Sequence, residues 1–111
     1  MLCCDVSKAR QLANQCFPTG TNLQTVVVHN DPKYGGAGYR TSNLATTSIN
    51  PSGPLVAIHE LGHSLFELAD EYNTGSGTAN SPNCDAQSSG CPKWADLIQQ
   101  GFDVSCNLAG C

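Results

Sequence analysis

Alternating blocks of polar and apolar residues predict a chain in which short helices and strands follow one another. Residues 5–16, DVSKARQLANQC, begin with an aspartate that suits a helix N-cap and continue with helix-forming side chains. Residues 23–30, LQTVVVHN, are dense in β-branched side chains and predict a buried strand in the middle of a small sheet. Residues 41–49, TSNLATTSI, combine β propensity with Thr and Ser, which predicts an edge strand.

Between Pro54 and about Asp70 the spacing of apolar residues becomes helical. Pro54 suits the first position of a helix, where a missing backbone N–H costs little. The apolar side chains that follow recur at intervals of three and four and form one stripe, which is expected to face the core. The stripe consists of Ile58, Leu61, Leu65 and Leu68.

A glycine-rich stretch, DPKYGGAGYR at residues 31–40, separates the two predicted strands. Its glycines can adopt positive φ angles or allow another part of the chain to approach closely. The spacing is not GxGxxG and no lysine follows as in a P-loop, so a phosphate-binding loop is not expected. Close backbone approach is the predicted role of Gly35, Gly36 and Gly38.

The last third of the chain predicts a long polar connection followed by one short helix. Residues 73–92 are mostly small and polar, and so long a connection inside a compact domain is usually functional or held by a disulfide. Residues 92–102, PKWADLIQQGF, predict a helix that starts at Pro92 and stops at Gly101. The side chains expected to face the core are Trp94, Leu97 and Ile98.

The length of the chain limits it to a single domain, residues 1–111, with one modest core. The formal net charge is −4 and only five residues are Lys or Arg, so no basic patch is available for nucleic acid or anionic lipid. No apolar run approaches the ~20 residues of a membrane span. We therefore expect a monomer with no nucleic-acid or membrane partner.

Seven cysteines among 111 residues, none in a C-x-x-C pair, indicate an oxidising compartment and a disulfide framework. The N-terminal residues MLCCDVSKARQ lack the charged and apolar regions of a signal peptide, so we expect a piece of a longer secreted protein. A cytosolic protein with reduced thiols is the competing interpretation. Spacing does not fix the pairing, and the candidates are Cys84 with Cys91, Cys106 with Cys111, and Cys16 with Cys3 or Cys4.

Residues 59–72, HELGHSLFELADEY, carry the candidate chemistry. His59 and His63 are one helical turn apart and project from the same face, so both imidazoles can reach one metal ion. Glu60 is adjacent and can remain outside the coordination shell, where it takes a proton from a zinc-bound water. The predicted activity is that of a zinc-dependent endopeptidase, with Zn2+ as cofactor and a peptide or protein as substrate.

Catalytic zinc normally has three protein ligands and one open position, so a third ligand must be found. Asp70 lies about 20° from the helical face that carries the histidines, but an unbroken helix would place it roughly 10 Å beyond His63. The helix must therefore end or bend after Leu65 for Asp70 to reach the ion. Asp70 is the favoured third ligand, and the alternatives are Glu71, which is longer, and His29, at the end of a predicted strand.

These motifs resemble the IgA-peptidase family of zinc metalloendopeptidases, a metzincin-like group. The resemblance implies an α+β, zincin-like fold, with a small mixed sheet packed on the zinc helix and, given the cysteines, disulfide-stapled loops. It gives His59 and His63 the metal-ligand role and Glu60 the role of general base, and it favours Asp70. It also implies that an edge strand within residues 34–49 pairs with an extended peptide substrate. The matching segments are VVVHNDPKYGGAGY, HELGHSLFELADEY, PNC and CPKWADLI.

Two features depart from the metzincin pattern. Phe66 stands where HExxHxxGxx(H/D) has glycine, and Asp70 comes one residue later than the third ligand of that pattern. The only methionine is Met1, so the methionine turn expected downstream of the zinc helix has no counterpart. Two other interpretations therefore stand beside the endopeptidase: a catalytically inactive, truncated zinc-binding interaction domain derived from such a peptidase, and a disulfide-rich secreted module without metal.

Overall fold

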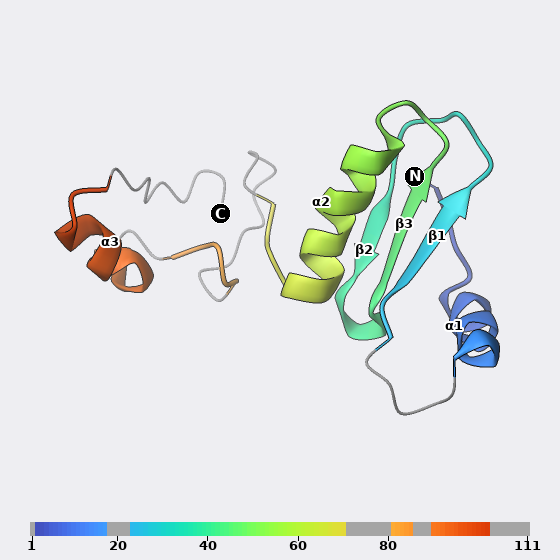
Figure 1. The fold of residues 1–111 in the computed structure, drawn as a ribbon, viewed down its shortest axis with the longest axis horizontal. Helices are drawn as coiled ribbons and strands as arrows, with labels where there is room; N and C mark the ends of the chain where they lie inside the picture. The colour runs from blue at the N-terminus through green and yellow to red at the C-terminus, as the bar shows by residue number, and fades with distance from the viewer. Residues whose placement is uncertain (1, 18–22, 71–80, 86–89, 103–111) are drawn as a thin grey trace. The chain divides into compact units, whose positions relative to one another are not determined.

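The structure is a computed structural model that describes residues 2–17, 23–70, 81–85 and 90–102. The chain divides into two compact units, Met1–Phe66 and Glu67–Cys111. Figure 1 labels the helices and strands of both units. No helix among the described residues is long and apolar enough to cross a membrane.

The first unit contains a three-stranded mixed sheet with a helix packed on it. The strands are β1 (Thr25–His29), β2 (Ala37–Tyr39) and β3 (Leu44–Ser48), in the order β1-β3-β2. β1 runs parallel to β3 and β2 runs antiparallel to it, which confirms the predicted mixed α+β architecture. Helix α2 (Gly53–Phe66) packs against β2 and β3 (Figure 1).

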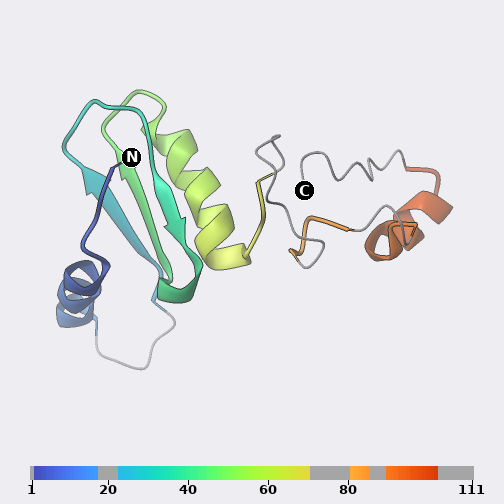
Figure 2. The ribbon, with the colours of Figure 1, turned by 180° about the vertical axis from the view of Figure 1, so that it is seen from behind.

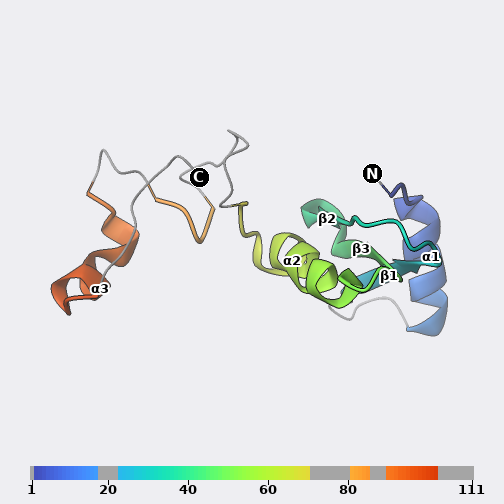
Figure 3. The ribbon, with the colours of Figure 1, turned by 90° about the horizontal axis from the view of Figure 1, so that it is seen from above.

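Helix α1 (Val6–Cys16) contacts β1 at the other side of the sheet (Figures 2 and 3). The predicted N-cap is confirmed, because the Asp5 side chain accepts a hydrogen bond of 3.0 Å from the backbone N–H of Lys8. Arg10 extends from this helix and donates to the carbonyl oxygen of Ser42 at 3.1 Å, in the short 3₁₀ helix η1 (Arg40–Ser42).

The two longer strands exchange the positions that the sequence predicts for them. β3 is the central strand and all five of its residues are buried, whereas β1 lies at an edge of the sheet. Val26 and Val28 on one face of β1 are 42% and 58% exposed. The prediction was wrong because β-branched density reports a preference for extended backbone, while strand order depends on which strands pair.

The first turn of α2 lies directly on the end of β3. A Cβ atom added at Gly53 would lie 2.1 Å from the carbonyl oxygen of Ser48, so only glycine fits at this position. The buried hydroxyl of Thr47 donates a hydrogen bond of 2.7 Å to the carbonyl oxygen of Gly53. These two contacts fix where the helix begins relative to the sheet.

Replacing Thr47 by valine is expected to lower the free energy of unfolding by about 1 kcal/mol, the usual contribution of one buried hydrogen bond. Valine keeps the shape of threonine but cannot donate to the carbonyl of Gly53. Urea unfolding of the parent and the variant measures the difference, with an unchanged slope against denaturant. Equal stability of the two chains would show that this hydrogen bond does not hold α2 on the sheet.

α2 packs on the sheet through small side chains and not through the stripe predicted from the sequence. Its buried residues are Gly53, Val56 and Ser64. Ile58 and Leu65, which the spacing assigned to the core, are 67% and 52% exposed. The prediction was wrong because periodicity identifies an apolar stripe without showing that this stripe is the face that meets the strands.

The end of α2 also differs from the prediction. The helix ends at Phe66 and does not continue to Asp70. Glu67 follows with φ of 58°, a left-handed conformation that ends many helices but is usually occupied by glycine. The helix therefore ends one residue after Leu65.

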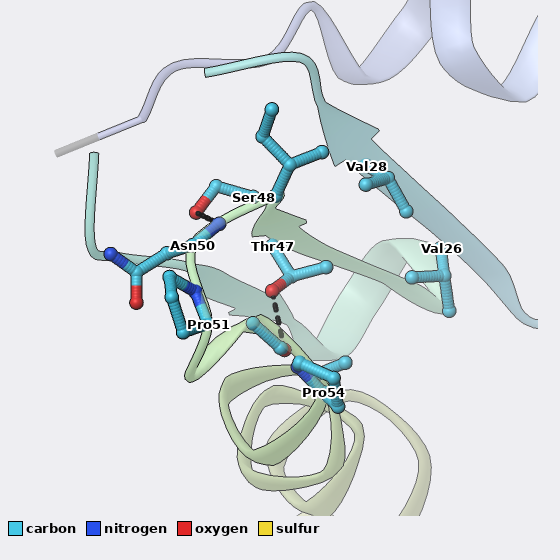
Figure 4. Close-up of a pocket in the computed structure, with 10 residues that line it drawn as sticks. Val26, Val28, Thr47, Ser48, Asn50, Pro51 and Pro54 are labelled. Atoms are coloured by element: carbon cyan, nitrogen blue, oxygen red, sulfur yellow. Dashed lines mark hydrogen bonds between the residues drawn. The ribbon is translucent and has the colours of Figure 1, made fainter. Parts of the chain in front are cut away.

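A pocket of about 440 Å³ lies between β1 and the first turns of α2 (Figure 4). Val26 and Val28 line it from the strand, and Pro54 and Ala57 line it from the helix. Its lining residues include no His, Cys, Asp or Glu side chain, so the pocket offers neither a metal ligand nor a general base.

The cysteines of the first unit do not form the predicted bridge. Cys3, Cys4 and Cys16 are all free thiols, so the expected pairing of Cys16 with Cys3 or Cys4 was wrong. Partial burial, reinforced by the carboxylate of Asp5, raises the pKa of the Cys4 thiol above its ordinary value. A raised pKa keeps this thiol protonated at neutral pH, which disfavours it as a nucleophile or metal ligand.

In the second unit, a short 3₁₀ helix η3 (Pro92–Trp94) leads into α3 (Ala95–Gln99). The predicted helix is confirmed, and Gly101 follows it with φ of 83°. Ile98 is 45% exposed, so its predicted core position was wrong. Cys84 and Cys91 are each 1% exposed and disulfide-bonded. The partners of Cys106 and Cys111 lie outside the described residues.

Lys93 joins two of the three described parts of the second unit, residues 81–85 and 90–102. Its ammonium group donates to the carbonyl oxygen of Ser81 at 2.8 Å and to that of Cys84. Its backbone N–H donates to a carboxylate oxygen of Asp85 at 2.5 Å. The ammonium group of Lys93 and the carboxylate of Asp85 are thus both bound to backbone atoms, which gives the two side chains a structural role.

Candidate metal centre

His59 and His63 meet on one face of α2. Residues four apart on an α-helix are neighbours on its surface, and here the two Nε2 atoms are 3.1 Å apart. The ring centroids are 4.6 Å apart and the rings are nearly perpendicular, at 86°. Each ring thus directs a nitrogen toward a common point, although without a metal one imidazole can also donate to the other.

Glu60 completes a group of three potential metal-ligating side chains. One ligand atom from each of His59, Glu60 and His63 lies within 4.8 Å of the other two. Among residues 2–17, 23–70, 81–85 and 90–102, this is the one group of three or more His, Cys, Asp or Glu side chains able to hold an ion. His59 is exposed and the other two are half-buried, so the group is open to solvent on one side.

The distance between the two imidazoles fits zinc. Two nitrogens bound to Zn2+ at about 2.0–2.1 Å with a tetrahedral angle between them are about 3.3 Å apart. The observed 3.1 Å separation of the Nε2 atoms of His59 and His63 is close to that value. A pair of imidazoles with an adjacent carboxylate is also a donor set that suits zinc.

The edge strand β2 packs directly against this group. A Cβ atom at Gly36 would lie 2.9 Å from Cγ of Glu60 and 2.6 Å from Cγ1 of Val56. A Cβ atom at Gly38 would lie 2.7 Å from Cβ of His63 and 2.6 Å from the carbonyl oxygen of Glu60. The prediction of close backbone approach is confirmed at both glycines. Gly35 differs, because its φ of 148° is itself unfavourable for other residues.

Asp70, the favoured third ligand, does not belong to the group of three. It is half-buried and lies beyond the end of α2, in the second unit. The side chain of Asn83 binds the neighbouring residue Ala69 twice: its Oδ1 accepts from the backbone N–H at 2.8 Å, and its Nδ2 donates to the carbonyl oxygen at 2.9 Å. The backbone beside Asp70 is thus held by a side chain from the PNC segment. Glu71, the alternative ligand, lies outside the described residues.

His29, the other alternative for the third ligand, does not belong to the group of three either. It is the last residue of β1, pairs in register with Ser48 of β3, and is absent from the group that can hold an ion. Its Nε2 atom is buried and has no hydrogen-bond partner within the described part of the chain. The alternative of His29 as third ligand is therefore not supported.

Two polar residues, Gln24 in the first unit and Asn83 in the second, make contacts that were not predicted from the sequence. Gln24 donates from Nε2 to the buried hydroxyl of Ser64 at 2.8 Å, next to His63 on α2. Asn83 clamps Ala69 as described above. Both contacts join residues far apart in the sequence, so no local pattern predicts them. Asn83 was named only within PNC, one of the segments that resemble the IgA-peptidase family.

Comparisons with known proteins agree with the geometry of this centre. A family model described as IgA Peptidase M64 matches residues 1–107, which is nearly the whole chain. Comparison with curated proteins and with solved structures gives no match.

Proposed function

Because the chain belongs to the IgA peptidase M64 family, a family of metallopeptidases, we propose that it binds zinc through His59 and His63 and hydrolyses peptide bonds with Glu60 as general base. The observation that carries the proposal is the convergence of these three side chains on one face of α2, with the two Nε2 atoms 3.1 Å apart. The family supports a peptide or protein as the substrate.

In the proposed reaction, the two histidines hold the metal and Glu60 moves the proton. Bound there, zinc supplies a Lewis acid that lowers the pKa of a water molecule to about 7. A carboxylate oxygen of Glu60 accepts the proton of the attacking water and returns it to the nitrogen of the leaving amine. Because Glu60 is half-buried beside β2, its carboxylate is partly shielded from solvent where it acts.

Asp70 is the proposed third zinc ligand, with Glu71 as the alternative. Two local features support Asp70. The helix ends at Phe66 and Glu67 turns the backbone, so the 10 Å displacement of an unbroken helix does not apply. The double hydrogen bond between Asn83 and Ala69 also fixes the backbone next to the Asp70 carboxylate.

The edge strand β2 is the proposed binding site for the peptide backbone. β2 lies at one end of the strand order, so no described strand pairs with its outer edge. An extended peptide can add to such an edge through main-chain hydrogen bonds. Gly36 and Gly38 place this strand directly beside Glu60 and His63, so a peptide bound there would run close to the metal ligands.

A secreted location remains part of the proposal. The disulfide-bonded state of Cys84 and Cys91 supports it, because disulfides persist in oxidising compartments. The free thiols of Cys3, Cys4 and Cys16 show that not all of the cysteines take part in such a framework.

Cleavage of an unbiased peptide library in the presence of zinc tests the proposal against its rivals. We expect new peptide ends, detected by mass spectrometry, that disappear with a chelator and return when zinc is restored. Zinc binding without cleavage would identify the inactive zinc-binding interaction domain instead. A chain that neither binds zinc nor cleaves peptides would be the disulfide-rich module without metal.

A further inference from the structure

We infer that Gly36 and Gly38 are positioning residues: Gly38 sets the place of the ligand His63, and Gly36 sets the place of the base Glu60. The inference deepens the proposed function and rests on it for the roles of these two groups. It assigns to strand β2 a second task besides offering its outer edge to a peptide. The strand would determine separately how well the metal is held and how well the proton is transferred.

The contacts of Gly38 concern the metal ligand. An added Cβ would meet Cβ of His63 at 2.7 Å and the carbonyl oxygen of Glu60 at 2.6 Å. Neither atom belongs to the flexible end of a side chain, so the backbone of α2 or of β2 would have to move. Because one of these atoms is Cβ of His63 itself, a local shift of α2 at this residue displaces its imidazole relative to that of His59, and the two Nε2 atoms are now 3.1 Å apart.

The contacts of Gly36 concern the base. An added Cβ would meet Cγ of Glu60 at 2.9 Å, Cγ1 of Val56 at 2.6 Å and the carbonyl oxygen of Thr46 at 2.5 Å. It comes near neither histidine. Because the contact with the carbonyl oxygen of Thr46 is a backbone contact, the chain at Gly36 would have to shift, and the Glu60 side chain would have to turn away as well, while neither imidazole is among the atoms contacted.

The residue between the two glycines provides a matched control. Ala37 pairs with Thr46 in the sheet, and in a strand its side chain points to the opposite face from those of its neighbours. Replacing Ala37 by glycine weakens β2 through backbone entropy without adding an atom against α2. The variant Ala37→Gly therefore shows how a less stable β2 strand, without a new steric contact, affects zinc binding and cleavage.

The experiment measures zinc affinity and peptide cleavage for the parent and for Gly38→Ala, Gly36→Ala and Ala37→Gly. We expect Gly38→Ala to weaken zinc binding at least about tenfold, as loss of a support behind a metal ligand typically does. Gly36→Ala should bind zinc within about twofold of the parent but lower kcat about 100-fold, the cost of displacing a catalytic group by about 1 Å. Ala37→Gly should keep the parental zinc affinity and kcat; because Ala37 belongs to the proposed peptide-binding strand, any effect on peptide binding should appear in KM.

NMR of the metal-free chains separates this inference from the proposed function. We expect Gly38→Ala to shift the ring resonances of His63, and Gly36→Ala to shift the side-chain resonances of Glu60 while leaving both rings unchanged. A parent chain that binds no zinc would refute the proposed function, whereas these shifts would still uphold the positioning contacts.

Three results would overturn the inference. The first is parental zinc affinity in Gly38→Ala, and the second is an equal loss of zinc affinity in all three variants. The third is a Gly38→Ala chain that stays unfolded with and without zinc, since Gly38 would then serve packing alone. If Gly36→Ala does not fold, the double variant Gly36→Ala with Val56→Ala, which removes the contact with Cγ1 of Val56, takes its place.

Discussion

Replacing Glu60 by glutamine is expected to lower kcat for peptide cleavage by a factor of about 10² to 10⁴ while zinc remains bound. Glutamine has nearly the same shape as glutamate, but its neutral amide cannot accept the proton of the attacking water. The two imidazoles that are proposed to hold the metal are unchanged by the substitution. The loss should therefore appear in kcat, measured on a peptide that the parent cleaves, and not in zinc content.

Glu67 provides the matched control for this substitution. It is an exposed carboxylate beyond the end of α2 and is not part of the group that can hold an ion. Replacing Glu67 by glutamine removes the same charge and should leave kcat unchanged. Cleavage by Glu60→Gln at the parental rate would show that another group takes the proton.

Replacing His63 by alanine is expected to weaken zinc binding more than about 100-fold, beyond the 10-fold to 100-fold loss typical of groups that only support a ligand. At a zinc concentration 100 times its dissociation constant, the parent gains about 2.7 kcal/mol of stability from the ion. The variant should gain almost none under the same conditions. Thermal unfolding with and without zinc measures this difference, and peptide cleavage should be lost with the metal.

The substitution His29→Gln controls for the loss of a histidine outside the candidate centre. Its ring lies at the end of β1 and takes no part in the candidate centre. Replacing His29 by glutamine should leave the stabilisation by zinc at the parental value, whatever the substitution does to the metal-free protein. If His29→Gln abolished the stabilisation and His63→Ala preserved it, the ligand assignment would be wrong.

The elements that were predicted correctly depend on neighbours in the sequence. Asp5 lies three residues before the amide that it caps, and His59 and His63 meet because a helix brings residues four apart together. The spacing of the two histidines therefore predicted most of the candidate metal centre without any knowledge of tertiary contacts. Gly36, directly before β2, and Gly38, within it, were predicted to allow close approach for a similar reason, since few other residues permit it.

The features that were predicted wrongly depend on contacts between distant segments. Strand order follows from the pairing of β3 with both β1 and β2, which the composition of a single strand does not encode. Two residues of the predicted apolar stripe, Ile58 and Leu65, are exposed, whereas the buried residues of α2 are Gly53, Val56 and Ser64. The left-handed Glu67 carries no local signal, because glycine usually occupies such a position.

The supporting contacts of the site are of the same long-range kind. Gln24 reaches Ser64 across 40 residues, and Asn83 reaches Ala69 across 14. Both are single amide side chains whose role depends on a partner that the fold brings to them. Gln24 holds the last turn of α2 in the first unit, and Asn83 holds the backbone beside Asp70 in the second.

Native mass spectrometry of the parent, Glu60→Gln and His63→Ala, each mixed with one equivalent of zinc, shows directly whether the two histidines bind the ion. We expect one zinc ion per chain in the parent and in Glu60→Gln, and little or none in His63→Ala. Equal zinc binding by the parent and His63→Ala, or no zinc on the parent, would contradict the assignment of His59 and His63 as metal ligands.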